Sequence, residues 1–249
     1  MFETLYEDDG PFMQYYREET EKFYCEFFNS RTDMEEFFMS VIKTREEDPV
    51  PMQMINQVRR FVCLSKNIEK IYPARDPLRI LFLRICMESL QYLSGQKNTK
   101  QFMSNFLKTM EPEGKAYILE NFKLSSIDFD EAAFSCLDEQ HTCPIPSYYW
   151  FQNDFQLENL FVVIKKIRDT VVHEGTFWET VIFGENEECP AITAFRTKAD
   201  ESIFPLKNEG IIYSGFCTYV FNTTLSFEKF IWYFVRTCIE YIKSYVDTI

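Results

Sequence analysis

The spacing of apolar residues predicts that most of this chain is α-helical. In the first half, apolar side chains recur at steps of three and four residues, the period of a helix with one buried face. We expect six helices there: Phe12 to Asn29, Thr32 to Thr44, Met54 to Tyr72, Pro77 to Leu93, Lys100 to Met110 and Gly114 to Phe122. Thr32 and Glu35 have the spacing of a capping box for the second helix, and the stretch 48–51 predicts a turn before the third.

A further long helix is predicted after the irregular stretch 124–153. Its apolar positions follow the same period: Phe155, Leu157, Leu160, Phe161, Ile164, Ile167, Val171 and Val172. Asn153 or Asp154 is a suitable cap, and Gly175 is a typical stop. At 100° per residue the apolar stripe is about 140° wide, and Arg168 falls inside it. A guanidinium there needs a buried acceptor, a subunit interface or an anionic ligand, because burying it unpaired is too unfavourable.

After this helix the pattern changes from a helical period to that of strands. Ala191 to Lys198 and Ile211 to Phe221 are predicted to be strands, with residues 208–210 as a turn between them. These segments indicate a small β-hairpin insertion over residues 180–222. Ser226 then caps a last helix, whose apolar residues lie on one face.

The fold expected from these elements is mainly α, a helical bundle with an N-terminal helical extension and the small hairpin insertion before the last helix. No segment has the composition of a linker, so we predict a single domain over residues 1–249. Its core bundle is expected over about residues 76–249, and the extension over residues 1–75.

Composition supports a compact protein and limits its partners. The 249 residues are 46% hydrophobic, which is enough to bury a core. No apolar run is long enough to span a membrane, and Met1 to Gly10 is acidic rather than a basic and apolar leader, so a cytoplasmic protein is the expectation. The net charge of −13 disfavours extensive binding to phosphate backbones. The chain is locally basic only near Lys165, Lys166 and Arg168.

The cysteines do not form a recognisable metal site, and no cofactor is expected. The sequence has 8 cysteines, none of them in a C-x-x-C pair. Cys136, His141 and Cys143 are the closest approach to a ligand cluster, but their spacing matches no standard zinc module. The aromatic run 148–151 could stack nucleic-acid bases, although such a run beside a helix start is more often core packing.

The best candidate for chemistry is the stretch Arg168-Asp169-Thr170-Val171-Val172-His173. It contains one of only 2 histidines and closes the predicted helix. An arginine followed by an acidic residue and then, five positions after the arginine, by a histidine resembles the R-x4-6-H motif of the HEPN superfamily. That resemblance covers about 25 residues around the motif and implies an α-helical, often dimeric, metal-independent RNA-cleaving domain.

The residue types fit RNA cleavage. A histidine with a pKa near neutrality can take the proton from a ribose 2′-hydroxyl, which then attacks the adjacent phosphate. An arginine presents a planar fork of donors to the phosphoryl oxygens. Asp169 and His173 are four residues apart, so the carboxylate could orient the imidazole. The resemblance therefore implies Arg168, Asp169 and His173 as the catalytic set, with RNA as substrate.

Helix geometry favours a site that two subunits share. Five residues separate Arg168 from His173, which gives roughly 7.5 Å of rise and about 140° of rotation, so their Cβ atoms lie about 10 Å apart. Two copies across a two-fold axis would bring two arginines and two histidines into one cleft, the arrangement known for HEPN nucleases. We therefore expect a homodimer, with a toxin or phage-defence role and a regulatory protein partner as open possibilities.

Each of these residues also has an ordinary explanation. A histidine near a helix C-terminus interacts well with the helix dipole, and Arg168 could form a buried ion pair with an acidic residue such as Glu88. The alternative to a nuclease is a non-catalytic helical module that binds a nucleotide or a protein partner through the same groove.

Overall fold

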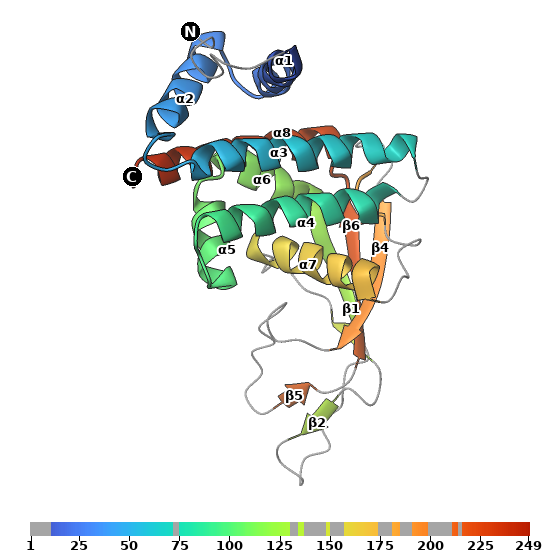
Figure 1. The fold of residues 1–249 in the computed structure, drawn as a ribbon. Coiled ribbons are helices and arrows are strands. Elements are labelled where there is room, and N and C mark those ends of the chain that lie inside the picture. The colour runs from blue at the N-terminus through green and yellow to red at the C-terminus, as the bar shows by residue number, and fades with distance from the viewer. Residues whose placement is uncertain are drawn as a thin grey trace. The chain divides into compact units, whose positions relative to one another are not determined.

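The computed structural model describes residues 11–71, 75–129, 134–136, 148–149, 157–173, 181–184, 191–198, 211–213 and 216–249. The chain is mainly helical, as predicted, and the residues fall into two compact units (Figure 1). The first comprises residues 1–71, 82–111 and 231–249, and the second comprises residues 72–81 and 112–230. The prediction of one domain is not decided by this division, because α4 and α8 each contribute residues to both units.

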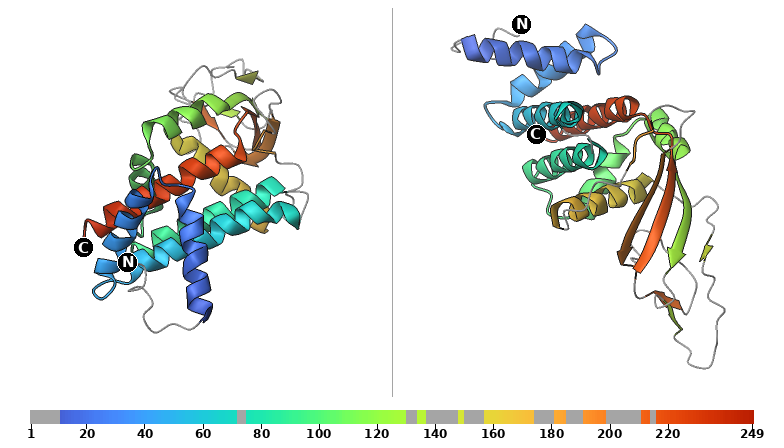
Figure 2. Two further views of the ribbon diagram at one scale, coloured as in Figure 1. Left: turned by 90° about the horizontal axis from the view of Figure 1, so that it is seen from above. Right: turned by 90° about the vertical axis from the view of Figure 1, so that its right-hand side faces the viewer.

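The first unit is built from helices. It contains α1 (Pro11–Cys25), α2 (Arg31–Thr44), α3 (Val50–Asn67), α5 (Thr99–Lys108), most of α4 (Arg75–Leu93) and most of α8 (Phe227–Val246). Helices α1 and α2 both contact α3. Helix α3 runs beside α8 in both Figure 1 and Figure 2. Predicted and observed helix ends agree to within a few residues, since each helix is specified by its own apolar stripe.

Two helix starts differ from the prediction. Ser30 rather than Thr32 caps α2, because the Ser30 hydroxyl accepts a hydrogen bond from the Asp33 backbone N–H at 3.1 Å. Helix α3 begins at Val50, so half of the predicted turn 48–51 is helical. Proline is tolerated at Pro51 because the first turn of a helix has no acceptor for its backbone donors. The predicted cap of the last helix is confirmed, since Ser226 precedes α8 and its hydroxyl accepts from the Lys229 N–H at 3.4 Å.

The second unit contains a larger sheet than the predicted hairpin. Strands β3 (Tyr148–Tyr149), β1 (Phe122–Phe129), β6 (Phe216–Thr223) and β4 (Ala191–Lys198) form one antiparallel sheet in that order. The two predicted strands do pair, as β4 and β6, but β6 also pairs with β1 on its other side. Two short strands, β2 (Phe134–Cys136) and β5 (Ile211–Tyr213), form a second pair. Helices α6 (Pro112–Asn121) and α7 (Leu157–His173) complete the described part of this unit.

Strand β1 lies in a region that was predicted to be irregular. Its sequence carries the period of a strand: Phe122 and Leu124 are buried, whereas Lys123 is exposed. A register shift between Leu124 and Ser126 interrupts the alternation and obscures it in the sequence. Phe122 stacks on Phe221 of β6 with ring centroids 4.9 Å apart. The pairing partner is almost 100 residues away, so no local signal identifies it.

The core of the first unit is aromatic and encloses Tyr24. This residue is fully buried, contacts the rings of Phe23, Phe37 and Phe38, and donates a hydrogen bond to the Ile55 carbonyl at 2.8 Å. Burial raises the pKa of the Tyr24 hydroxyl well above its usual value of 10.0, because the phenolate would lose its hydration.

The cap assignment predicts the effect of a substitution at Ser30. We expect Ser30→Ala to lower the free energy of unfolding by about 1 kcal/mol, because the Asp33 N–H loses its acceptor. Thr32→Ala, which removes the hydroxyl at the position favoured by the sequence pattern, should change it by less than about 0.5 kcal/mol. Urea unfolding of both variants decides between the two caps, and a larger loss for Thr32→Ala would contradict the assignment to Ser30.

Tyr24 predicts a loss of stability at alkaline pH. Above pH 10 the unfolded chain releases the phenolic proton while the folded chain retains it, so stability falls as pH rises. The contribution of one such group is about 1.4 kcal/mol per pH unit above its unfolded pKa.

Tyr24→Phe should therefore show a shallower alkaline decline than the wild type in urea unfolding between about pH 10 and 11. Tyr15→Phe, at an exposed position, serves as the control because its hydroxyl is not held in the core. Parallel declines for Tyr24→Phe and the wild type would show that Tyr24 does not govern this pH dependence.

Candidate functional site

The predicted motif helix is present as α7, and it ends at His173. The residues that form its apolar stripe are buried: Leu157, Leu160, Phe161, Ile164 and Ile167. Arg168 follows the last of these and carries the charge that the stripe analysis singled out. The predicted caps at 153–154 and 175 lie outside the described residues, as do the side chains of Val171 and Val172.

Arg168 is partly accessible and pairs with its neighbour. Its Nη1 atom donates to Oδ1 of Asp169 at 2.7 Å, and the side chains of Arg168 and Asp169 are 26% and 33% exposed. The expectation that Arg168 has an anionic partner is thus met within the motif itself. Neither side chain is sealed in the core, so a ligand in solution can approach both.

The role predicted for Asp169 was to orient His173. In the structure the Asp169 carboxylate contacts the Arg168 guanidinium, which draws these two motif residues together. The side chain of His173 is not among those described, so its orientation by Asp169 stays a prediction. What the structure places is the backbone: Arg168 and His173 stand five residues apart on one continuous helix.

Glu88 was considered as an acidic partner for Arg168, but it has another cationic neighbour. Its Oε1 atom accepts a hydrogen bond from Nε of Arg84, one turn earlier on α4, at 3.1 Å. Arg84 is buried, whereas the Glu88 side chain is one-third exposed. An apolar helix can carry this glutamate because its charge is compensated within the same helix.

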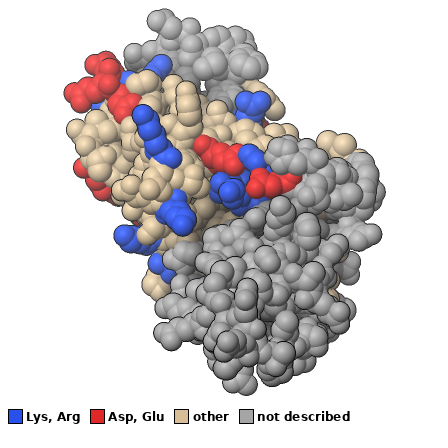
Figure 3. Space-filling model, turned by 90° about the horizontal axis from the view of Figure 1, so that it is seen from below, with Lys and Arg blue, Asp and Glu red and all other residues tan. Residues whose placement is uncertain are grey.

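The basic residues in view do not form a continuous surface. On the face shown in Figure 3, the lysine and arginine side chains of the described residues stand singly or beside acidic ones. Lys165, one turn before Asp169, is exposed. An extended basic surface is the usual feature of proteins that coat nucleic acid without sequence preference. The distribution on this face is that of a protein whose contacts with an anion would be few and local.

Other candidate ligands fall partly outside the described residues. The side chains of Cys136, His141 and Cys143 are not described, and neither are those of the aromatic run 148–151. Within the described part of the chain, no group of three or more His, Cys, Asp or Glu side chains is placed to hold a metal ion. Among the same residues, no helix is long and apolar enough to cross a membrane.

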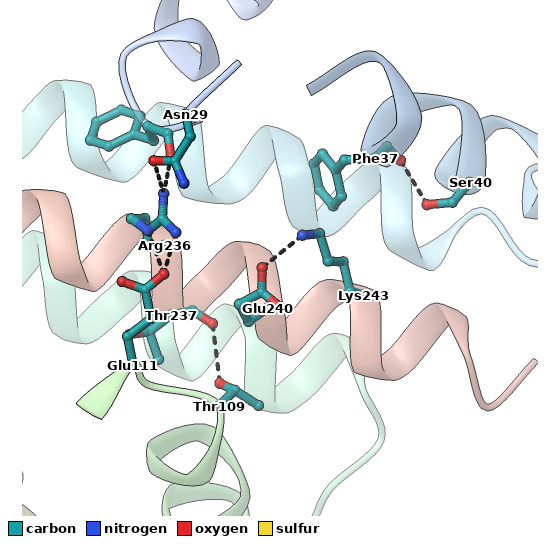
Figure 4. Close-up of polar contacts among 10 residues, drawn as sticks. Asn29, Phe37, Ser40, Thr109, Glu111, Arg236, Thr237, Glu240 and Lys243 are labelled. Carbon is teal, nitrogen blue, oxygen red and sulfur yellow. Dashed lines mark hydrogen bonds and ion pairs between the residues drawn. The ribbon is translucent and has the colours of Figure 1, made fainter. Parts of the chain in front are cut away.

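A polar cluster around Arg236 was not predicted from the sequence (Figure 4). Its Nε and Nη2 atoms donate to Oε1 of Glu111, and its Nη1 donates to the Phe27 carbonyl at 3.1 Å and to Oδ1 of Asn29 at 3.3 Å. Its guanidinium also lies 4.6 Å from the ring centroid of Trp232. Arg236 thus joins the α1–α2 connection and the residue that follows α5 to α8.

A cavity of about 190 Å³ adjoins this cluster in the first unit. Its lining includes two acidic and two basic side chains, and the full set is Phe27, Phe28, Asn29, Asp33, Arg236, Ile239, Glu240 and Lys243. Lys243 pairs with Glu240 at 2.7 Å. With opposite charges already paired in its wall, this cavity shows no preference for an anion or a cation. The pairing partners are 125 or more residues apart in the sequence, so local patterns hold no signal for them.

Comparison with known proteins finds no counterpart for this arrangement: no family model, curated protein or solved structure matches the chain. The argument for function therefore depends on the residues of the motif, their position on α7 and the chemistry that they can support.

Proposed function

We propose that the chain is a metal-independent endoribonuclease of the HEPN type, in which Arg168 and His173 act on the scissile phosphodiester. The observation that carries the proposal is the position of the motif. Arg168 lies on α7 with a partly exposed guanidinium, and the helix ends at His173. A mainly helical chain agrees with the proposal, whereas the four-stranded sheet is an addition to the expected bundle.

The proposed mechanism needs only the chain's own residues and the RNA. Neutral His173 takes the proton of a ribose 2′-hydroxyl, whose oxygen attacks the neighbouring phosphorus. The bond from phosphorus to the 5′-oxygen breaks, leaving a 2′,3′-cyclic phosphate and a 5′-hydroxyl end. Arg168 donates hydrogen bonds to the phosphoryl oxygens as negative charge builds on them. DNA lacks the 2′-hydroxyl and is not a substrate.

Asp169 contributes by holding the guanidinium of Arg168. A contact at 2.7 Å orients the arginine before substrate arrives, and a phosphate then competes with the carboxylate for the same donors. An ion pair that is one-quarter to one-third exposed is weak, at about 0–1 kcal/mol, so the substrate can displace it.

The same pair also supports the second candidate, a non-catalytic module that binds a nucleotide or a protein partner. A guanidinium already neutralised by Asp169 is suited to exchange one carboxylate for another, including one from a partner protein. A toxin or phage-defence role, with a regulatory partner, would follow from the nuclease and not from this module.

Cleavage of total RNA in the presence of a chelator distinguishes the two candidates. The wild-type protein should cut RNA and not DNA, and His173→Ala should reduce the rate at least about 100-fold, because the general base is lost. His141→Ala, at the only other histidine, is the matched control and should cut at the wild-type rate.

Arg168→Ala should remove cleavage while the protein stays folded, and Lys165→Ala on the same helix controls for the loss of one positive charge. Cleavage that persists in both His173→Ala and Arg168→Ala would assign the activity to a different site or to a contaminant. RNA binding without cleavage by the wild type would favour the non-catalytic module.

The separation of Arg168 and His173 further predicts that two protomers share the site. With Cβ atoms about 10 Å apart on one helix, the pair closes on a phosphate only when a second copy supplies the complementary residue. The specific activity should therefore fall on dilution below the dimer dissociation constant. Light scattering at the assay concentrations, run beside the cleavage assay, tests this, and a monomer that cuts at full rate would rule out the shared site.

A further inference from the structure

The start of α4 and the segment that follows α7 meet at one buried carboxylate. Asp76, on the first turn of α4, is 5% exposed. Its Oδ2 atom accepts hydrogen bonds from the backbone N–H groups of both Ile182 and Phe183, each at 2.9 Å. These two amides lie 106 and 107 residues later in the sequence, so the contact is tertiary and not part of a helix cap.

The two oxygens of this carboxylate have different partners. While Oδ2 holds the backbone, Oδ1 accepts from Nη1 of Arg79 at 3.3 Å, and Arg79 is also buried. The Arg79 guanidinium lies 3.9 Å from the ring centroid of Phe227. The Phe183 ring packs edge-on against the same ring at 5.0 Å. Asp76 is therefore neutralised on one side and engaged by a fixed pair of backbone donors on the other.

The segment held by Asp76 is also tied to the end of the sheet. The Thr223 hydroxyl donates to the Ile182 carbonyl at 2.8 Å and accepts from the Leu225 N–H at 3.2 Å. The Gly184 N–H donates to the Leu225 carbonyl at 3.0 Å. Residues 182–184 are thus fixed between the first turn of α4 and the connection from β6 to α8.

This anchored segment follows the motif closely in the sequence. Ile182 is nine residues after His173, the last residue of α7. Helix α7 lies over one face of the sheet of β1, β6 and β4 in both Figure 1 and Figure 2, within the same unit as the anchored segment. A helix end is the part of a helix most prone to fraying, and an anchor nearby in the chain limits the conformations open to it.

We propose that Asp76 is the positioning residue of the motif helix: its carboxylate fixes residues 182–183 and thereby the last turn of α7, which carries His173. The proposal deepens the proposed function, since a fixed helix end matters for catalysis only if His173 is the base. The carboxylate does not touch the substrate, and its effect passes through the backbone that it holds. Because the two oxygens have separate partners, substitutions can separate the anchor from the ion pair.

The choice of variants follows from the two oxygens. Asp76→Ala removes both contacts. Asp76→Asn retains an oxygen for the backbone amides but turns an N–H₂ group toward the donors of Arg79, so it should weaken the anchor without abolishing it. Glu88→Gln, on the same helix, is the control, because its carboxylate contacts Arg84 and lies apart from residues 182–183 in the sequence and in the compact units.

Amide hydrogen exchange on the full chain measures the anchor without reference to activity. In Asp76→Ala the amides of Ile182, Phe183 and residues 170–173 should exchange about tenfold faster or more, since a charge-assisted hydrogen bond that opposes local opening is lost. Asp76→Asn should show a smaller increase at the same amides, and it keeps the test available if Asp76→Ala does not fold. Exchange in α3, and in all segments of Glu88→Gln, should remain at the wild-type rate.

Cleavage kinetics provide the second readout. If Asp76 acts by positioning, Asp76→Asn should lower kcat about tenfold while KM changes by less than about twofold, because binding determinants are retained. Unchanged exchange at residues 170–173 despite faster exchange at Ile182 and Phe183, or a wild-type kcat in Asp76→Asn, would overturn the proposal. A wild type that cuts no RNA would instead refute the proposed function, and hydrogen exchange would still decide whether Asp76 fixes the end of α7.

Discussion

The buried carboxylate of Asp76 is the contact on which the described part of the second unit most depends. Removing one partner of a buried, hydrogen-bonded charge typically costs about 3–5 kcal/mol, whereas a whole domain is stable by about 5–15 kcal/mol. Asp76 has such partners in Arg79, Ile182 and Phe183. One side chain thus holds together the start of a helix and a distant backbone segment, which Thr223 in turn connects to the sheet.

The ion pair of Arg168 with Asp169 is of a different kind. Both side chains are partly exposed, so their attraction is screened by water and contributes about 0–1 kcal/mol. An apolar residue at position 168 would extend the buried stripe of Ile164 and Ile167 and stabilise α7 as much or more. Stability therefore does not explain why a charge stands there, and this comparison of magnitudes is what favours a functional role for Arg168.

Local patterns in the sequence predicted the helices well and the contacts between distant segments poorly. Helix α7 and the Ser226 cap of α8 were predicted because apolar period and capping act within a few residues. The cap of α2 was misplaced by two residues, since Ser30 and Thr32 are chemically similar and only backbone geometry separates them. Strand β1 was missed because a bulge breaks its alternation.

Of the candidate site, the sequence predicted the helix and its end at His173, but not the partner of Arg168. Asp169 was expected to face His173, and its contact with the adjacent guanidinium depends on side-chain rotamers that a residue pattern does not specify. The anchor at Asp76 was not predicted at all. An aspartate before a proline at a helix start is typical of a local cap, and nothing nearby in the sequence reveals that its acceptor oxygens serve residues more than 100 positions away.

The net charge of −13 constrains what a ribonuclease built on this chain can do. Non-specific affinity for RNA comes from phosphate contacts with lysine and arginine, and each added contact steepens the dependence on salt. An acidic protein with few basic side chains near its motif gains little from this source. Two copies of the motif in one cleft would double the local positive charge without changing the rest of the surface. A shared site therefore accounts both for the 10 Å separation on α7 and for phosphate binding by an acidic protein, and it favours substrates whose shape, rather than charge alone, brings them into the cleft.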